Sequence, residues 1–152
     1  MSVTKIERDL RIEATPEVVY EVISSAEHLR EWWPDDAAFD AVVGSTGHVT
    51  FGDPTSPDAK TERLTVVEAD APHRFAFLWV YGAEDAAQEA LLVTFDLSPC
   101  EEGTLLRFSE SGFDEREWDA ATAVQARADH EQGWDTFLPR LATYAGSLAP
   151  RP

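Results

Sequence analysis

The chain has 152 residues, of which 43% are hydrophobic and 11% aromatic, and its formal net charge is −17 at pH 7. This composition predicts a single folded domain over residues 1–152 with a sizeable core, and it excludes a disordered chain. A field of this sign repels phosphate backbones and anionic lipid headgroups, so nucleic acid and membranes are not expected as partners.

Three features predict a cytoplasmic location. No apolar run approaches the ~20 residues that span a bilayer. The first residues lack the basic and apolar stretches of an export signal. Cys100 is the single cysteine, which excludes an internal disulfide and fits a reducing compartment.

The first third of the chain predicts one strand followed by two short helices. Residues 4–13 alternate mostly between apolar and charged side chains, as a half-buried strand does. Thr15 is the expected N-cap of the next helix and Pro16 its first residue. A second short helix is expected over residues 26–32, before Pro34.

The middle of the chain predicts about five strands separated by turns. The strands are expected over residues 44–51, 61–69, 74–81, 90–97 and 104–111, with turn-rich or polar segments over 52–58, 70–72, 82–88 and 98–103.

A long amphipathic helix is expected at the C-terminal end. Trp134, Phe137, Leu138 and Leu141 follow one another at helical spacing and form its apolar face. A helix placed after the strands, and not between them, must cover one face of an antiparallel sheet, because neither surface can bury its apolar side alone. The fold class is therefore α+β.

Several short motifs carry a family resemblance: residues 12–20, Glu31-Trp32-Trp33, residues 67–75, Ser111-Gly112-Phe113, and Gly133-Trp134. With these motifs the chain resembles the helix-grip fold of the START-like superfamily, also called SRPBCC or the polyketide cyclase/dehydrase group. It is most similar to the branch named after the activator of the ninety-kilodalton heat-shock-protein ATPase. Two departures are the relaxed glycine motif at residues 44–47 and Glu110, which stands where the family often has a histidine.

The resemblance implies a single START-like domain over residues 1–152. Its curved antiparallel sheet of about six strands would wrap around the long C-terminal helix, with two short helices after the first strand. It also implies a scaffold that holds a ligand or binds a protein.

Large aromatic side chains gather on one face of the expected sheet. By alternation, Phe75, Phe77, Trp79 and Tyr81 share a face of one strand. Flat rings suit an apolar or aromatic guest, but an ordinary core explains them equally well. The candidate ligand-binding residues are Trp33, Phe51, Phe77, Trp79, Phe95, Phe108, Glu110, Trp134 and Leu138.

Glu110 allows two interpretations. It shares a face with Leu106 and Phe108, so it could point toward the helix, where a buried carboxylate is costly unless it is paired or protonated. There it could anchor a polar ligand group or act as an acid or base. The favoured interpretation is that the strand ends here and the carboxylate reaches solvent, as charged groups usually do.

No motif for nucleophilic or metal catalysis is visible. The four histidines lie on separate elements without metal-ligand spacing, and no phosphate-binding glycine loop is present. Asp129, His130 and Glu131 are successive helical residues on different faces, so no catalytic dyad is expected among them. Neither a cofactor nor a metal is expected, and an enzymatic role is not favoured.

Three functions remain open. The preferred hypothesis is a protein that binds an apolar small molecule in a cavity between helix and sheet, with a volume on the order of several hundred Å³. The second is a co-chaperone-like module that binds a chaperone. The third is an enzyme of the cyclase or dehydratase type with Glu110 as acid or base.

Overall fold

The computed structural model describes residues 5–53, 55–80, 90–101, 103–113 and 120–148. Tyr81 and the expected loop over residues 82–88 lie outside this part of the chain.

Seven antiparallel strands form one sheet in the order β1-β7-β6-β5-β4-β3-β2. The strands are β1 (Lys5–Ile12), β2 (Asp36–Ala38), β3 (Thr46–Phe51), β4 (Lys60–Asp70), β5 (Arg74–Trp79), β6 (Leu91–Cys100) and β7 (Gly103–Ser111). The helices are α1 (Pro16–Ser24), α2 (Ala26–Trp32) and α3 (Ala120–Leu148). The α+β class is confirmed. The sheet has one strand more than the six expected, because three-residue β2 is too short to show a sequence pattern.

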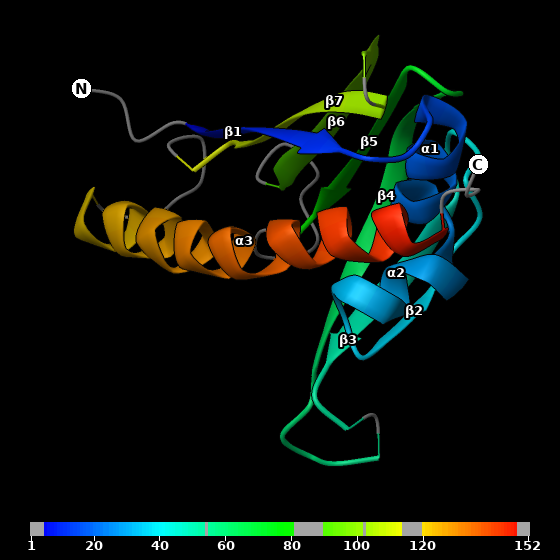
Figure 1. Cartoon of the computed structure of the whole chain (residues 1–152). Helices are drawn as coiled ribbons and strands as arrows, with labels where there is room; N and C mark the ends of the chain where they lie inside the picture. The colour runs from blue at the N-terminus through cyan, green and yellow to red at the C-terminus, as the bar shows by residue number, and fades with distance from the viewer. Residues whose placement is uncertain (1–4, 54, 81–89, 102, 114–119, 149–152) are drawn as a thin grey trace.

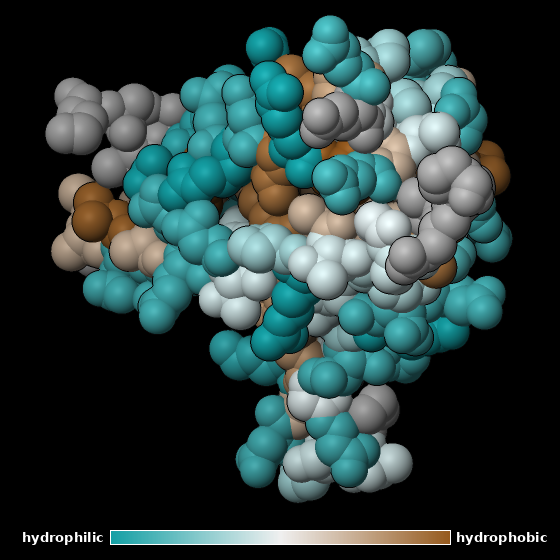
Figure 2. Space-filling view, viewed as in Figure 1, coloured by the Kyte–Doolittle hydropathy of each residue, from teal (hydrophilic) through white to brown (hydrophobic). Residues whose placement is uncertain are grey.

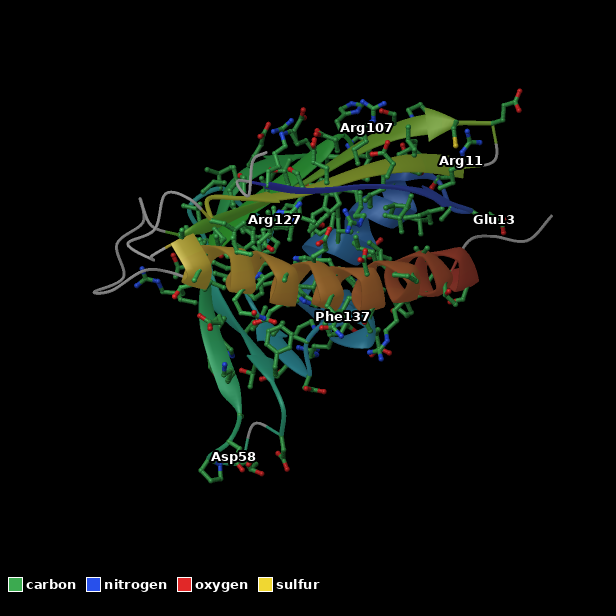
Figure 3. The ribbon with its side chains drawn as sticks, turned by 90° about the vertical axis from the view of Figure 1, so that its left-hand side faces the viewer. Arg11, Glu13, Asp58, Arg107, Arg127 and Phe137 are labelled. Carbon is green, nitrogen blue, oxygen red and sulfur yellow. The ribbon has the colours of Figure 1, made fainter. Side chains whose placement is uncertain are left out.

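Helix α3 lies across one face of the sheet beside β1, and α1 and α2 pack near its C-terminal half (Figure 1). The hairpin of β3 and β4 extends beyond α3 in two perpendicular views (Figures 1 and 3). The sheet and three helices therefore share one interior, which is the expected helix-grip arrangement.

Local sequence signals fix the two short helices. The Thr15 hydroxyl accepts a hydrogen bond from the Val18 backbone N–H at 3.3 Å, and Pro16 begins α1. This satisfies one of the N–H groups that every helix start leaves unpaired. Helix α2 ends at Trp32, and Trp33 and Pro34 follow directly. The chain therefore leaves α2 with Trp32 and Trp33 both buried beneath the sheet.

The apolar side of α3 is buried, as its spacing predicted. Trp134, Leu138 and Leu141 are at most 3% exposed, whereas Phe137 is only partly buried. Figure 3 shows Phe137 on the side of α3 that faces the β3–β4 hairpin, while Arg107 lies on the far side of the sheet. The face in Figure 2 is mostly hydrophilic, and its brown residues form small separate spots.

An ion-pair network joins α3 to the edge strand β1. Arg8 contacts Glu131 at 2.6 Å and Asp135 at 2.8 Å, two residues one helical turn apart. Arg127 donates to the Lys5 carbonyl at 3.0 Å and also pairs with Glu131. The hydrogen bond from Arg8 is the largest cause that lowers the pKa of Asp135. These contacts set where α3 lies along β1.

Replacing Arg8 by glutamine should lower the free energy of unfolding by about 1 kcal/mol, because the network is partly solvated and screened. Asp135 has a lowered folded-state pKa, so its contribution is present above its usual value of 3.8. That contribution disappears as pH falls through the lower folded-state pKa. Urea unfolding of both proteins at neutral pH and below pH 3.8 should show the difference shrinking in acid.

The matched control is Arg11→Gln, which removes an exposed arginine from the same strand. Equal losses in the two variants would contradict a specific role for the Arg8 network.

Candidate functional site

Glu110 lies near the end of β7, on the apolar inner face of the sheet. It is fully buried, and its strand partners on the two sides are Ile6 and Val93, which are also fully buried. Leu106 and Phe108 share its face, as alternation predicted. The interpretation that Glu110 reaches solvent is therefore wrong: β7 continues to Ser111, and α3 covers its end.

Three ring nitrogens surround the Glu110 carboxylate. Trp79 donates to Oε2 at 2.8 Å, and Trp134 donates to Oε1 at 2.9 Å. His130 Nδ1 lies 2.9 Å from Oε1. We call these four residues the Glu110 cluster. A buried carboxylate is costly unless such partners replace its water shell.

The donor set indicates an ionised carboxylate. An indole N–H can only donate, so each carboxylate oxygen must accept at least one hydrogen bond. An ionised carboxylate is an acceptor only, which assigns the third proton to His130 Nδ1. Among the residues that the structure describes, neither an arginine nor a lysine forms an ion pair with Glu110.

The cluster is assembled from three distant elements. Trp79 is the last residue of β5, and Glu110 is the next-to-last residue of β7. His130 and Trp134 are one turn apart on α3 and therefore lie on the same side of that helix. The site exists only when α3 is docked in a single position on the sheet.

The Ser111-Gly112-Phe113 motif turns the chain at the end of β7. Gly112 has φ of +109°, and a Cβ there would lie 3.0 Å from the Ala90 carbonyl oxygen. Only glycine adopts this conformation freely. The turn brings fully buried Phe113 against the His130 ring, edge to face, with ring centroids 5.4 Å apart. The motif thus helps to orient His130.

An aromatic pocket of about 150 Å³ adjoins the Glu110 cluster. It is lined by Trp33, Phe51, Trp79, Asp129, His130, Gly133, Trp134 and Phe137.

Trp33 holds the rings of this pocket together. Its centroid lies 5.0 Å from that of Trp79 and 5.1 Å from that of Trp134. Phe51 packs on Trp33 at 5.7 Å and on Phe137 at 6.5 Å. Such offset and edge-to-face contacts favour a fixed arrangement of rings. The pocket therefore has largely preformed apolar walls with one histidine among them.

The nine candidate residues divide into three groups. Four of them line the aromatic pocket, namely Trp33, Phe51, Trp79 and Trp134. Glu110 lies directly behind the pocket, bonded to two of its walls. The others are core residues no more than 2% exposed, namely Phe77, Phe95, Phe108 and Leu138. That the nine contact a ligand stays a prediction.

The pocket is smaller than expected because rings fill the space under α3. Phe108 packs against Trp134 with centroids 4.5 Å apart and against Phe95 at 5.5 Å. The part of α3 that borders the remaining open space runs from Asp129 to Phe137.

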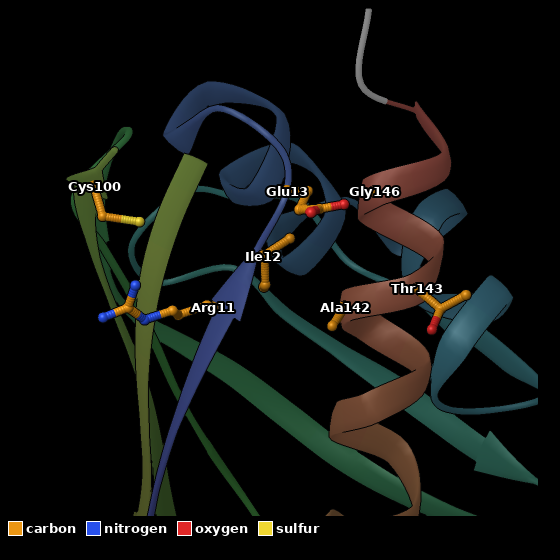
Figure 4. A pocket seen from close by; sticks show the side chains of 7 residues that line it. All are labelled: Arg11, Ile12, Glu13, Cys100, Ala142, Thr143 and Gly146. Atoms are coloured by element: carbon orange, nitrogen blue, oxygen red, sulfur yellow. The ribbon is translucent and has the colours of Figure 1, made fainter. Parts of the chain in front are cut away.

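A larger pocket of about 480 Å³ lies between the end of β1 and the C-terminal half of α3 (Figure 4). Its charged wall residues, Arg11 and Glu13, are exposed, and its remaining walls are Ile12, Cys100, Ala142, Thr143 and Gly146. We place the candidate site in the smaller pocket, because Glu110, the one buried charged side chain among the described residues, stands behind its wall.

Sequence reasoning missed His130. It compared this residue with its neighbours Asp129 and Glu131, whose carboxylates have other partners: Asp129 accepts from Gln125, and Glu131 pairs with Arg8. The available signal was the four-residue spacing between His130 and Trp134.

Among the described residues there is no cluster of His, Cys, Asp or Glu able to hold a metal ion. None of the helices in that part of the chain is long and apolar enough to cross a membrane.

Replacing Glu110 by glutamine should reduce the free energy of unfolding by about 2–4 kcal/mol. The amide has one oxygen, so its NH₂ group must face an indole N–H and leave that buried donor unpaired. Denaturant unfolding measures the loss. The exposed Glu7→Gln should change stability by less than about 0.5 kcal/mol. A similarly small effect at Glu110 would show that the cluster is not under electrostatic constraint.

Solved structures of other proteins share this fold. Protein MLL2253 from Mesorhizobium loti matches with a TM-score of 0.76 at 18% identity, over 96% of this chain and 99% of that one. The Aha1 dimer from Colwellia psychrerythraea matches with a TM-score of 0.72 at 22% identity, over 93% of this chain and 96% of that one. DynU16, from the dynemicin biosynthetic locus, matches with a TM-score of 0.72 at 20% identity, over 97% of this chain and 49% of that one. At these identities the likeness shows the fold alone.

No curated protein matches the chain. A family model described as Activator of Hsp90 ATPase homolog 1-like protein matches residues 13–146, which is most of the sequence. The resemblance seen in the short motifs is thus confirmed, and the chain belongs to the family of Activator of Hsp90 ATPase homolog 1-like proteins.

Proposed function

We propose that this protein binds a small apolar or aromatic molecule in the aromatic pocket. The observation that carries the proposal is the set of five ring side chains around an open space, with a buried carboxylate directly behind two of them. Five aromatic rings give a guest an apolar enclosure, and the two polar residues at the wall, Asp129 and His130, give it orientation.

The size of the pocket limits the guest. An apolar cavity of roughly 150 Å³ admits a benzene-sized molecule. A single substituted ring, or one ring of a longer ligand, therefore fits the volume of about 150 Å³. With about ten heavy atoms at ~0.4 kcal/mol each, a simple probe should bind with Kd on the order of 1 mM.

Membership of the family also supports binding as the general role, of either a ligand or a protein. A chaperone partner is the second candidate, and it rests on the family description and on the Aha1 structure among the neighbours. The exposed large hydrophobic residues of the described chain are Val42, Val43, Val67, Val124 and Leu148. They come from several elements, whereas the aromatic pocket is one continuous feature, so we favour the small molecule.

We propose further that residues 1–152 act as one START-like domain in the cytoplasm. The single cysteine, Cys100, is a free thiol, which supports a reducing compartment.

Gly133 offers a direct test, because a Cβ there would meet no atom within 4 Å although the residue lines the pocket. Gly133→Leu should fill the pocket and abolish binding of 4-nitrotoluene, while stability stays the same or rises by about 0.5–1 kcal/mol through better helix propensity. Binding is measured by NMR shifts of the Trp79 and Trp134 indole N–H groups and by tryptophan fluorescence quenching.

The matched control is Gly146→Leu, on the same helix but at the larger pocket of Figure 4. It should leave binding unchanged. Undiminished binding to Gly133→Leu, or no binding to the native protein at millimolar concentration, would reject the proposal.

A further inference from the structure

His130 is the one member of the Glu110 cluster with a polar atom that remains available. Its side chain is 23% exposed, and it lines the aromatic pocket. Nδ1 is engaged by Glu110, and the ring packs on Trp79 and Phe113. Within the described part of the chain, Nε2 has no hydrogen-bond partner.

The protonation of the ring follows from Glu110. Since Nδ1 carries the proton donated to the carboxylate, Nε2 of the neutral ring holds a free electron pair. The two nitrogens of an imidazole point in diverging directions, so Nε2 is directed away from Glu110. The pocket therefore has a proton acceptor in a wall that is otherwise mostly aromatic.

A protonated His130 ring would face the Glu110 carboxylate. Glu110 would then form a buried ion pair with the imidazolium at the existing 2.9 Å contact. Asp129, which directly precedes His130 on α3, is exposed, lines the pocket and accepts from Gln125. Glu131 is already paired with Arg8 and Arg127, so it adds little.

We propose that His130 Nε2 accepts the proton of a weakly acidic hydroxyl, such as that of a phenol or enol, on a flat ligand in the aromatic pocket. Glu110 acts as a positioning residue that fixes the ring and stabilises the imidazolium. This inference rests on the proposed function and names the chemical class of ligand for the same site.

The proton transfer balances without a further reactant. The ligand O–H bond breaks, its oxygen keeps the electron pair, and the proton forms a new N–H bond at Nε2. The products are an oxyanion and an imidazolium held side by side, with Glu110 on the far side of the ring. The ligand enters neutral, which avoids repulsion by a chain of net charge −17.

A cationic ligand is the obvious competitor, because aromatic rings and a carboxylate commonly recognise amines. The geometry disfavours it. Both oxygens of Glu110 are occupied by N–H donors, and the residue is fully buried without lining the pocket. Asp129 is the carboxylate that does line the pocket, but it is exposed to solvent and already accepts from Gln125. The hydrogen-bonding group that the cluster presents to a guest is the histidine.

The test uses 4-nitrophenol, whose anion absorbs visible light, and 4-nitrotoluene, which has the same shape without the hydroxyl. At a pH where free nitrophenol is mostly protonated, the native protein should raise the nitrophenolate absorbance on binding. It should also bind nitrophenol about tenfold more tightly than nitrotoluene. In His130→Gln both effects should disappear: bound nitrophenol stays un-ionised, and its affinity falls to that of nitrotoluene for the same variant.

Glu110→Gln tests the positioning role, since it keeps the size of the side chain but removes the negative charge. It should ionise a smaller fraction of its bound nitrophenol than the native protein does. If this variant does not fold, the comparison of native protein with His130→Gln, at a residue that is not fully buried, still decides the question.

If the native protein and His130→Gln bind un-ionised nitrophenol equally well, the inference is overturned. The proposal that the aromatic pocket binds a small molecule would be unaffected. Tighter binding of phenyltrimethylammonium than of nitrophenol would overturn it in favour of a cation site. If neither nitro compound binds, both the proposed function and this inference are rejected.

Discussion

A negatively charged carboxylate buried on the apolar face of the sheet is the constraint on which this structure depends. Glu110 is fully buried between Ile6 and Val93, where water cannot solvate it. It is tolerated because two indole N–H groups and one imidazole N–H replace that water. Since these donors come from β5 and α3, the helix must dock in one position for the charge to be satisfied.

The aromatic pocket follows from the same constraint. Trp79 and Trp134 turn their N–H groups toward Glu110, so their ring faces are left for neighbouring rings and for the open space beside them. Trp33, placed at the end of α2, packs against both. The ion pairs of Arg8 with α3 act at the opposite edge of that helix and hold it against β1. A stabilising polar cluster and a binding site are thus parts of one arrangement.

Much of this could be predicted from local patterns. Alternation along β7 placed Glu110 beside Leu106 and Phe108, and helical spacing placed Trp134, Leu138 and Leu141 on one buried side. The orientation of Glu110 could not be decided in this way, because solvent access at the end of β7 depends on α3, whose position is set by contacts far apart in sequence. The same holds for the pocket volume, which depends on how closely Phe95, Phe108 and Trp134 pack. His130 was predictable from its spacing to Trp134.

The state of the Glu110–His130 contact tests the central claim most directly. NMR of protein labelled with carbon-13 and nitrogen-15 reports the Glu110 carboxyl shift and the shifts of both His130 ring nitrogens. For the ligand-free protein at neutral pH, we expect an ionised carboxylate, a protonated Nδ1 and an unprotonated Nε2. A carboxyl shift typical of a neutral acid, or an unprotonated Nδ1, would contradict the account.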